Sequence, residues 1–137
     1  MDSPKSLVLP FPVECLPDVE AGIALFEAGD FWESHEAWER AWIVLPRSQP
    51  KIMLQAMIQM AACAVLLQAK RLKGFHRKMA QVKFKLEGFV ALGIEAFPPF
   101  SVQGGLDFLE NLASFQALES NAQKQAIQSA FKQVLYA

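Results

Sequence analysis

Apolar residues recur at intervals of three and four residues along most of the chain. This period indicates amphipathic helices, because residues at these intervals share one face of an α-helix. The predicted helices cover about 17–28, 30–44, 50–72, 75–92, 106–115 and 122–136. Gly29, Pro46 and the pair Pro98 and Pro99 separate them, and no segment shows convincing strand alternation. The pattern predicts an all-α fold, a single-domain helical bundle of about five to six helices.

Residues at the predicted helix boundaries supply start and stop signals. Asp30 is predicted to cap the second helix, and Glu33, three residues later, completes an Asp-x-x-Glu variant of the capping box. Ser48 and Pro50 give the cap and first-turn signals of the third helix. Gly74 is predicted to separate the third helix from the fourth.

The third predicted helix is apolar on nearly every face, which is typical of a central helix surrounded by its neighbours. Its most apolar stretch, Ile52 to Leu67, has 16 residues and includes Gln55 and Gln59. About 20 apolar residues are needed to cross a bilayer. We therefore expect a buried helix and no membrane.

The composition fits one compact domain. The chain has 137 residues, of which 53% are hydrophobic and 20% charged. Residues 1–16 are predicted to form an extended N-terminal leader, followed by a single helical domain over 17–137. The leader lacks the features of a secretory signal, and Cys15 and Cys63 lack metal-binding or redox spacing. Two free thiols predict a cytoplasmic protein.

The segment GDFWESHEAWERAW, residues 29–42, combines carboxylates and a histidine with three tryptophans. At about 100° per residue, His35 falls in the middle of an aromatic stripe formed by Phe31, Trp38 and Trp42. We therefore expect His35 to be buried.

The same segment belongs to a predicted helical hairpin. Its residues match the later part of a tetratricopeptide repeat at Gly29, Phe31, Ser34, Trp38, Ala41 and Pro46. The chain shows no second copy, and a repeat array needs about three stacked units. The bundle is therefore predicted to be built on one tetratricopeptide-like helical hairpin.

Five polar residues are predicted to meet at a buried or cleft-side site. They are His35, Glu36, Glu39, Gln55 and Gln59. A carboxylate buried without a partner is destabilising by several kcal/mol, so an inward-facing glutamate needs the donors that the histidine and the amides supply. A structural polar network is the leading interpretation. A carboxylate beside a histidine in an apolar setting is also typical of acid–base catalysis.

The possible metal ligands are His35 and Glu39, four residues apart. A metal site needs three or four ligands at about 2.0–2.2 Å, so a residue of the third helix would have to complete the set. The chain has no second Glu-x-x-His, no His-Glu-x-x-His, no Gly-rich phosphate loop and no nucleophile elbow. The sequence assigns no cofactor and favours a non-catalytic protein over an enzyme.

Seven lysines and arginines lie between Lys70 and Lys85, with no acid among them. A solvated helix face is the leading interpretation. The weaker alternative is an anion-binding patch made of Lys70, Arg71, Lys73, Arg77 and Lys78. Because the net charge is −1, the whole chain has no field that would attract nucleic acid, and we do not expect a nucleic-acid partner.

Two segments, LFEAGDFWESHEAWERAW and LQAMIQMAACAVLLQ, are followed by Lys73 and Gly74. Together they resemble the bacterial and archaeal family called domain of unknown function 309. The resemblance implies a small cytosolic all-helical protein with a Glu-x-His-Glu motif on one helix and a Leu-Ile-Gln-like motif on the next. These positions are Glu33, His35, Glu36, Glu39 and Trp42, then Ile58 and Gln59. The family has no established activity, so the resemblance implies no substrate.

We predict a cytosolic helical domain with a scaffold or interaction role, which binds a protein partner or a second copy of itself. Its polar network is expected to contain His35, Glu36, Glu39 and Gln59. The alternative is a small metal-binding protein or a hydrolase-like enzyme that uses His35, Glu36 and Glu39.

Overall fold

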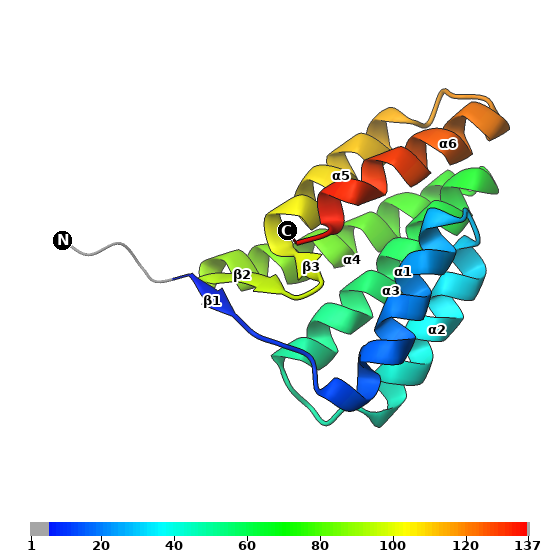
Figure 1. The fold of residues 1–137 in the computed structure, drawn as a ribbon. Helices are drawn as coiled ribbons and strands as arrows, with labels where there is room; N and C mark the ends of the chain where they lie inside the picture. The colour runs from blue at the N-terminus through cyan, green and yellow to red at the C-terminus, as the bar shows by residue number, and fades with distance from the viewer. Residues whose placement is uncertain (1–5, 137) are drawn as a thin grey trace.

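The computed structural model describes residues 6–136, and these residues form a bundle of six α-helices (Figure 1). The helices are α1 (Leu16–Glu27), α2 (Phe31–Val44), α3 (Gln49–Gln68), α4 (Leu72–Ala91), α5 (Val102–Ser114) and α6 (Ser120–Ala130). Two short 3-10 helices, η1 (Val13–Cys15) and η2 (Phe131–Val134), lie before α1 and after α6. The all-α fold class is confirmed.

The first four helices pack in chain order, each antiparallel to the next, so that α3 lies between α2 and α4 (Figure 1). α5 packs on α4, and α6 contacts α1, α3 and α5.

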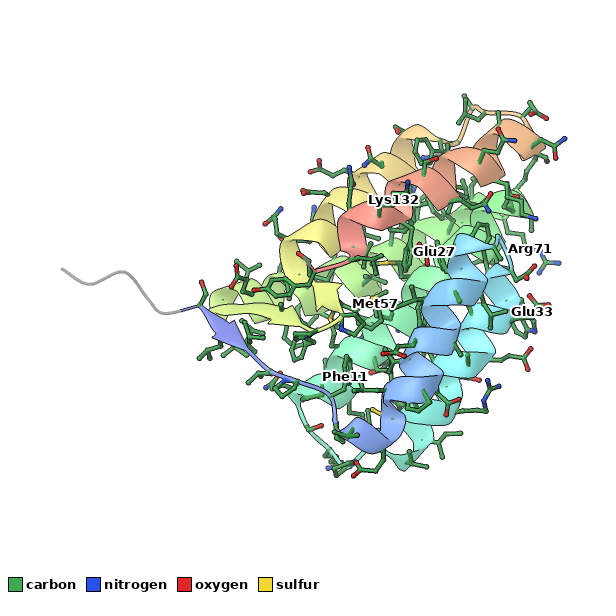
Figure 2. All side chains as sticks on the ribbon, in the orientation of Figure 1. Phe11, Glu27, Glu33, Met57, Arg71 and Lys132 are labelled. Atoms are coloured by element: carbon green, nitrogen blue, oxygen red, sulfur yellow. The ribbon has the colours of Figure 1, made fainter. Side chains whose placement is uncertain are left out.

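By length and composition α3 could span a membrane, yet 56% of its most apolar 18-residue window is buried by the rest of the molecule. Figure 2 shows Met57 of α3 inside the bundle, whereas Glu33 and Arg71 lie at its outer edge. This burial is typical of the core helix of a soluble protein.

A close contact between Gly22 and Trp38 joins α1 to α2. The Trp38 side chain is fully buried, and its indole Nε1 donates a hydrogen bond of 3.0 Å to the Val19 carbonyl. A side chain at Gly22 would overlap the indole ring. Ser34 Oγ donates a second bond, of 2.8 Å, to the Gly22 carbonyl. Glycine and serine therefore allow the two helices to approach closely enough for the buried indole to find its acceptor.

Aromatic rings connect this helical hairpin to the C-terminal half of the chain. Phe26 of α1 lies at their centre, with its ring centroid 4.2 Å from that of Phe131 and 4.7 Å from that of Phe31. Trp38 and Phe108 also pack on Phe26. These contacts hold α1 and α2 against α5 and η2 in one hydrophobic core.

A three-stranded sheet, which the apolar period does not predict, lies at one end of the bundle (Figure 1). β2 (Ile94–Phe97) pairs in parallel with β1 (Leu7–Val8) and antiparallel with β3 (Phe100–Ser101). Pro98 and Pro99, which were expected to mark a connecting loop, form the turn between β2 and β3. Strands of two to four residues are too short to show alternation. In addition, β1, one of the two partners of β2, is distant from it in sequence.

The segment predicted as an extended leader contributes β1 and then passes along the core. Phe11 is 4% exposed and packs on Phe97 and Phe100. The first five residues of the predicted leader lie outside the described residues.

The helix boundaries show which end signals operate. Ser48 caps α3 as predicted, because its Oγ accepts a bond from the Lys51 amide. The capping box at α2 is wrong: the Asp30 side chain accepts no cap bond there. The Asp30 amide instead donates to Leu25 O at 2.9 Å, in the turn that closes α1 at Gly29 (φ 86°). With this bond in place, the backbone of Asp30 has φ −90° and ψ 68°. It does not adopt the extended conformation that residues with a side-chain cap usually have.

The boundary between α3 and α4 also differs from the prediction. α4 begins at Leu72, so Gly74 lies in its first turn rather than before it. The turn is made by Lys70, whose φ is 59°, and the Arg71 amide donates to Leu66 O at 2.9 Å. A lysine thus takes the left-handed position that glycine usually occupies at a helix end.

The contact at Gly22 predicts a specific loss of stability. We expect Gly22→Ala to lower the free energy of unfolding by about 1–3 kcal/mol, because the added methyl group overpacks the site against the indole. Gly88→Ala on α4 is the matched control: a Cβ there meets nothing within 4 Å, so the change should stabilise by about 0.5–1 kcal/mol. Urea denaturation measures both, and equal effects of the two substitutions would contradict the packing argument.

Both cysteines are buried free thiols, 2% exposed at Cys15 and fully covered at Cys63. Burial raises the pKa of the Cys63 thiol to about 12 and also raises the pKa of Cys15. At pH 8 a thiol with this pKa is ionised to only about one part in ten thousand. We conclude that both cysteines are structural and unreactive in the folded protein.

We therefore expect native protein at pH 8 to react with a thiol reagent such as Ellman's reagent only as fast as it unfolds. Urea at the unfolding midpoint should release both thiols rapidly, because the unfolded chain returns them to their ordinary pKa. Fast modification of Cys63 in the native state would contradict its burial.

Candidate functional site

A polar cleft lies on the outer side of α3, where α2 and α4 flank it. Its cavity has a volume of about 260 Å³. The lining residues are His35, Glu39, Trp42, Gln55, Ile58, Gln59, Ala62 and Lys78. On α2 and α3 the lining residues recur at intervals of three and four, so each of these two helices turns one edge toward the cleft, and α4 contributes Lys78. Four of the five predicted site residues meet here.

Glu36, the fifth predicted site residue, does not line the cleft. It is exposed on α2, about 100° around the helix from His35. Glu39 lies one turn after His35 and reaches the cavity.

His35 forms the centre of the α2 edge. Its Nε2 lies 3.9 Å from Glu39 Oε1, and its side chain is 17% exposed against 48% for Glu39. The imidazole stacks on Trp32, with ring centroids 4.9 Å apart and an interplanar angle of 8°. Its Nδ1 is buried and has no hydrogen-bond partner within the described residues. His35 was expected to be buried, but its side chain is only partly buried. One face of its ring is covered by Trp32 and not by the core.

A chain of hydrogen bonds connects α3 to α4 beside the cleft, through the lining residue Gln59. Lys85 Nζ donates to Gln59 Oε1 at 2.9 Å, and Gln59 Nε2 donates to Gln81 Oε1 at 3.0 Å. Burial, together with the nearby charge of Lys78, lowers the pKa of Lys85. Gln59 therefore bonds to α4 rather than to His35 and Glu39 on α2.

The basic series of α4 divides into two groups. Lys78 is half-buried and lines the cleft. The other members of the predicted anion-binding patch, Lys70, Arg71, Lys73 and Arg77, are exposed. Neither of the two ion pairs found within residues 6–136 involves any of these side chains.

Lys78 was predicted only as part of the anion-binding patch, and Gln81 and Lys85, which bond to the cleft residue Gln59, were not predicted. All three lie at intervals of three and four residues, on one flank of the apolar stripe that contains Val82 and Leu86. This spacing was available in the sequence as a sign that they share one edge of α4. Which neighbour that edge faces depends on the packing of α4 against α3.

The cleft continues along α3 toward its N-terminus. A second cavity of about 350 Å³ shares Trp42 and Gln55 with the first and extends to Arg47 and Ile52. Lys51 Nζ lies 4.5 Å from the centroid of the Trp42 ring and donates to the Leu45 carbonyl at 2.8 Å. The two cavities form one groove along the outer side of α3.

A larger cavity, about 510 Å³, lies on the opposite flank of α4, against α5. Its floor is apolar, with Met79, Leu106 and Leu109, and its rim carries Lys83 and Glu110. No predicted site residue lines it. The sequence predicts these leucines and this methionine only as parts of helix faces.

The donor set of the cleft limits its chemistry. Within residues 6–136, no three histidine, cysteine, aspartate or glutamate side chains are grouped so that they could hold a metal ion. His35 and Glu39 offer two ligands, and α3 contributes amides instead of a third strong one. The arrangement can donate and accept hydrogen bonds and attract charge of either sign.

Residues 19–78 match the model of the family named Domain of unknown function (DUF309). The match confirms the resemblance drawn from the sequence over that segment, which ends within α4. The matched segment contains every residue that lines the first cavity, whereas Gln81 and Lys85 lie after the end of the segment. No curated protein and no solved structure matches the chain. The family model therefore covers the cleft without assigning it a ligand.

The two-ligand geometry predicts the behaviour toward zinc. In isothermal titration of protein purified without an affinity tag, we expect no saturation at one equivalent, because two side chains do not complete a zinc site. His35→Gln should leave the titration unchanged. One equivalent of zinc held tightly by the native protein and lost in His35→Gln would contradict this prediction.

Proposed function

We propose that the protein is a non-catalytic interaction domain that binds a protein partner on the outer side of α2, α3 and α4. We call this surface the α2–α4 face. It consists of Trp32, Glu36, Glu39 and Ile43 on α2, Ile52, Gln55 and Gln59 on α3, and Arg77, Lys78, Gln81 and Phe84 on α4. On each helix these positions recur at intervals of three and four, so they lie along one side.

The observation that carries the proposal is the exposure of large apolar side chains on the α2–α4 face. Phe84 is 80% exposed, Ile43 69% and Trp32 54%. Burying an aromatic or branched side chain contributes about 1.5–3 kcal/mol, so each is an available source of binding energy. Aromatic residues near a half-buried polar centre are also typical of the residues that dominate protein interfaces.

The shape of the face supports binding rather than catalysis. Its cavities are shallow segments of one long groove. The acid–base pair of His35 and Glu39 lies at the edge of that groove, with Glu39 half exposed. An extended surface that mixes apolar, acidic and basic side chains can contact a macromolecule over a larger area than a small substrate needs.

A cytoplasmic location is part of the proposal. Its support is the apolar α3, which is buried as a core helix, and the two cysteines, which are free although each is enclosed in the core. Free structural thiols are typical of a reducing compartment.

Hydroxyl-radical footprinting tests whether the face is covered where the protein works. We expect Phe84 and Trp32 to be oxidised less in the producing cells than in dilute purified protein, because a partner shields them. Tyr136, which is 37% exposed and lies after η2, is the matched aromatic control and should react equally in both. Mass spectrometry of the peptides gives the ratio, and equal oxidation of Phe84 in both samples would refute the proposed function.

A further inference from the structure

Charge is separated across the α2–α4 face. On its α2 side the exposed acids are Glu36 and Glu39. The α4 side carries four lysines and arginines, which are Lys73, Arg77, Lys78 and Lys85, whereas Lys83 and the acid Glu87 line the cavity on the opposite flank of α4. One face therefore presents an acidic edge and a basic edge, separated by the neutral glutamines of α3.

The two edges do not neutralise each other within the molecule. α3 lies between them, and the described ion pairs are His35 with Glu39 and Arg40 with Asp18. No lysine or arginine of α4 forms an ion pair within residues 6–136. Both edges thus keep their charge available for a partner, while the net charge of −1 creates little repulsion between whole molecules.

The edges are also aligned with each other. Because α2 and α4 are both antiparallel to α3, they run in the same direction (Figure 1). Glu39 and Lys78 line the same cavity, so the acidic and basic edges reach similar heights along α3. A partner with the same spacing and the reverse order of charges would match both edges at once.

A second copy of the chain is such a partner when it is turned about an axis parallel to α3. This two-fold rotation exchanges the left and right edges of the face but preserves height, so α2 of each copy meets α4 of the other. Rotation about the other axis in the face, perpendicular to the helices, would set acid against acid and base against base. Only the first arrangement is electrostatically favourable.

We infer that the α2–α4 face binds a second copy of this chain about a two-fold axis parallel to α3. The inference rests on the proposed function and names its partner. In the pair, Glu36 and Glu39 of each copy face Arg77 and Lys78 of the other. The exposed Phe84 then lies against α2 of the second copy, and the α3 helices meet at the axis.

The small side chains around Phe84 favour this close approach. Ala80 and Gly88 lie one turn before and after it, and a Cβ at Gly88 would meet nothing within 4 Å. The surface of α4 is therefore low on both sides of one protruding ring, which leaves room for the side chains of another helix.

Charge reversal tests the pairing. Sedimentation velocity of the wild type should show a dimer. Glu36→Lys with Glu39→Lys should raise the dissociation constant at least about tenfold, and so should Arg77→Glu with Lys78→Glu, because each pair of changes creates like-charge contacts. The variant that carries all four changes should return to within about threefold of the wild type. Lys83→Glu with Lys132→Glu, both away from the face, is the matched control and should leave the constant unchanged.

Circular dichroism confirms that each variant is folded before its dissociation constant is compared. A cysteine test then fixes the orientation, since both native thiols are buried. A mixture of Glu36→Cys and Ala80→Cys proteins should form a disulfide between copies, whereas either protein alone should not. A crosslink in Glu36→Cys alone would overturn the axis.

The failure of this inference is distinguishable from failure of the proposed function. Wild type that stays monomeric at about 100 μM, or four changes that do not restore pairing, would overturn self-association. If Phe84 were still protected in cells, the interaction domain would stand with a different protein as its partner. If Phe84 were unprotected as well, both would fail.

Discussion

The structure depends on the contact in which the Trp38 indole occupies the space above Gly22. The buried N–H must find an acceptor, and the Val19 carbonyl is within reach only when α1 and α2 lie close together. This contact fixes the rotation of α2 about its own axis. Because Trp38 points inward, His35 and Glu39 are turned toward the cleft beside α3, and Glu33 and Glu36 are turned toward solvent.

The second constraint is the apolar surface of α3. Neighbouring helices cover most of it, and the strip left open carries Gln55 and Gln59. Primary amides suit this strip, since they can bond to neighbours without the desolvation penalty of a charge. Lys85 approaches this strip from α4, and its ammonium group donates to Gln59. The cleft is polar because the bundle leaves this side of α3 uncovered.

Helical periodicity was sufficient to predict the bundle, the α1–α2 hairpin and the cap at Ser48, since each depends on residues close in sequence. The sheet could not be predicted in this way, because β1 and β2 are held together by pairing between Leu7 and Ile94 across most of the chain. The capping box failed for a similar reason. The motif at Asp30 was present, but its amide closes the preceding helix and takes the backbone away from the capping conformation.

The candidate site was predictable to the extent that it lies on single helices. The spacing of His35 and Glu39 placed both on one edge of α2, and the structure brings them to one cavity with Gln55 and Gln59. Lys78 was predicted only as part of a surface patch, because a wheel drawn for α4 alone does not show which flank meets α3. The relative rotation of two packed helices determines that, and it depends on side chains from both.

The chain of bonds from Lys85 through Gln59 to Gln81 has a fixed direction. An ammonium group can only donate, so Gln59 must accept with its oxygen and pass an N–H onward to Gln81. Gln81 receives this bond with its own oxygen, and within residues 6–136 its amide nitrogen donates to no other group. Gln59 and Gln81, two neutral side chains, thus continue the donor direction that the half-buried Lys85 ammonium group sets. A group that bonds to the Gln81 amide nitrogen must bring an acceptor.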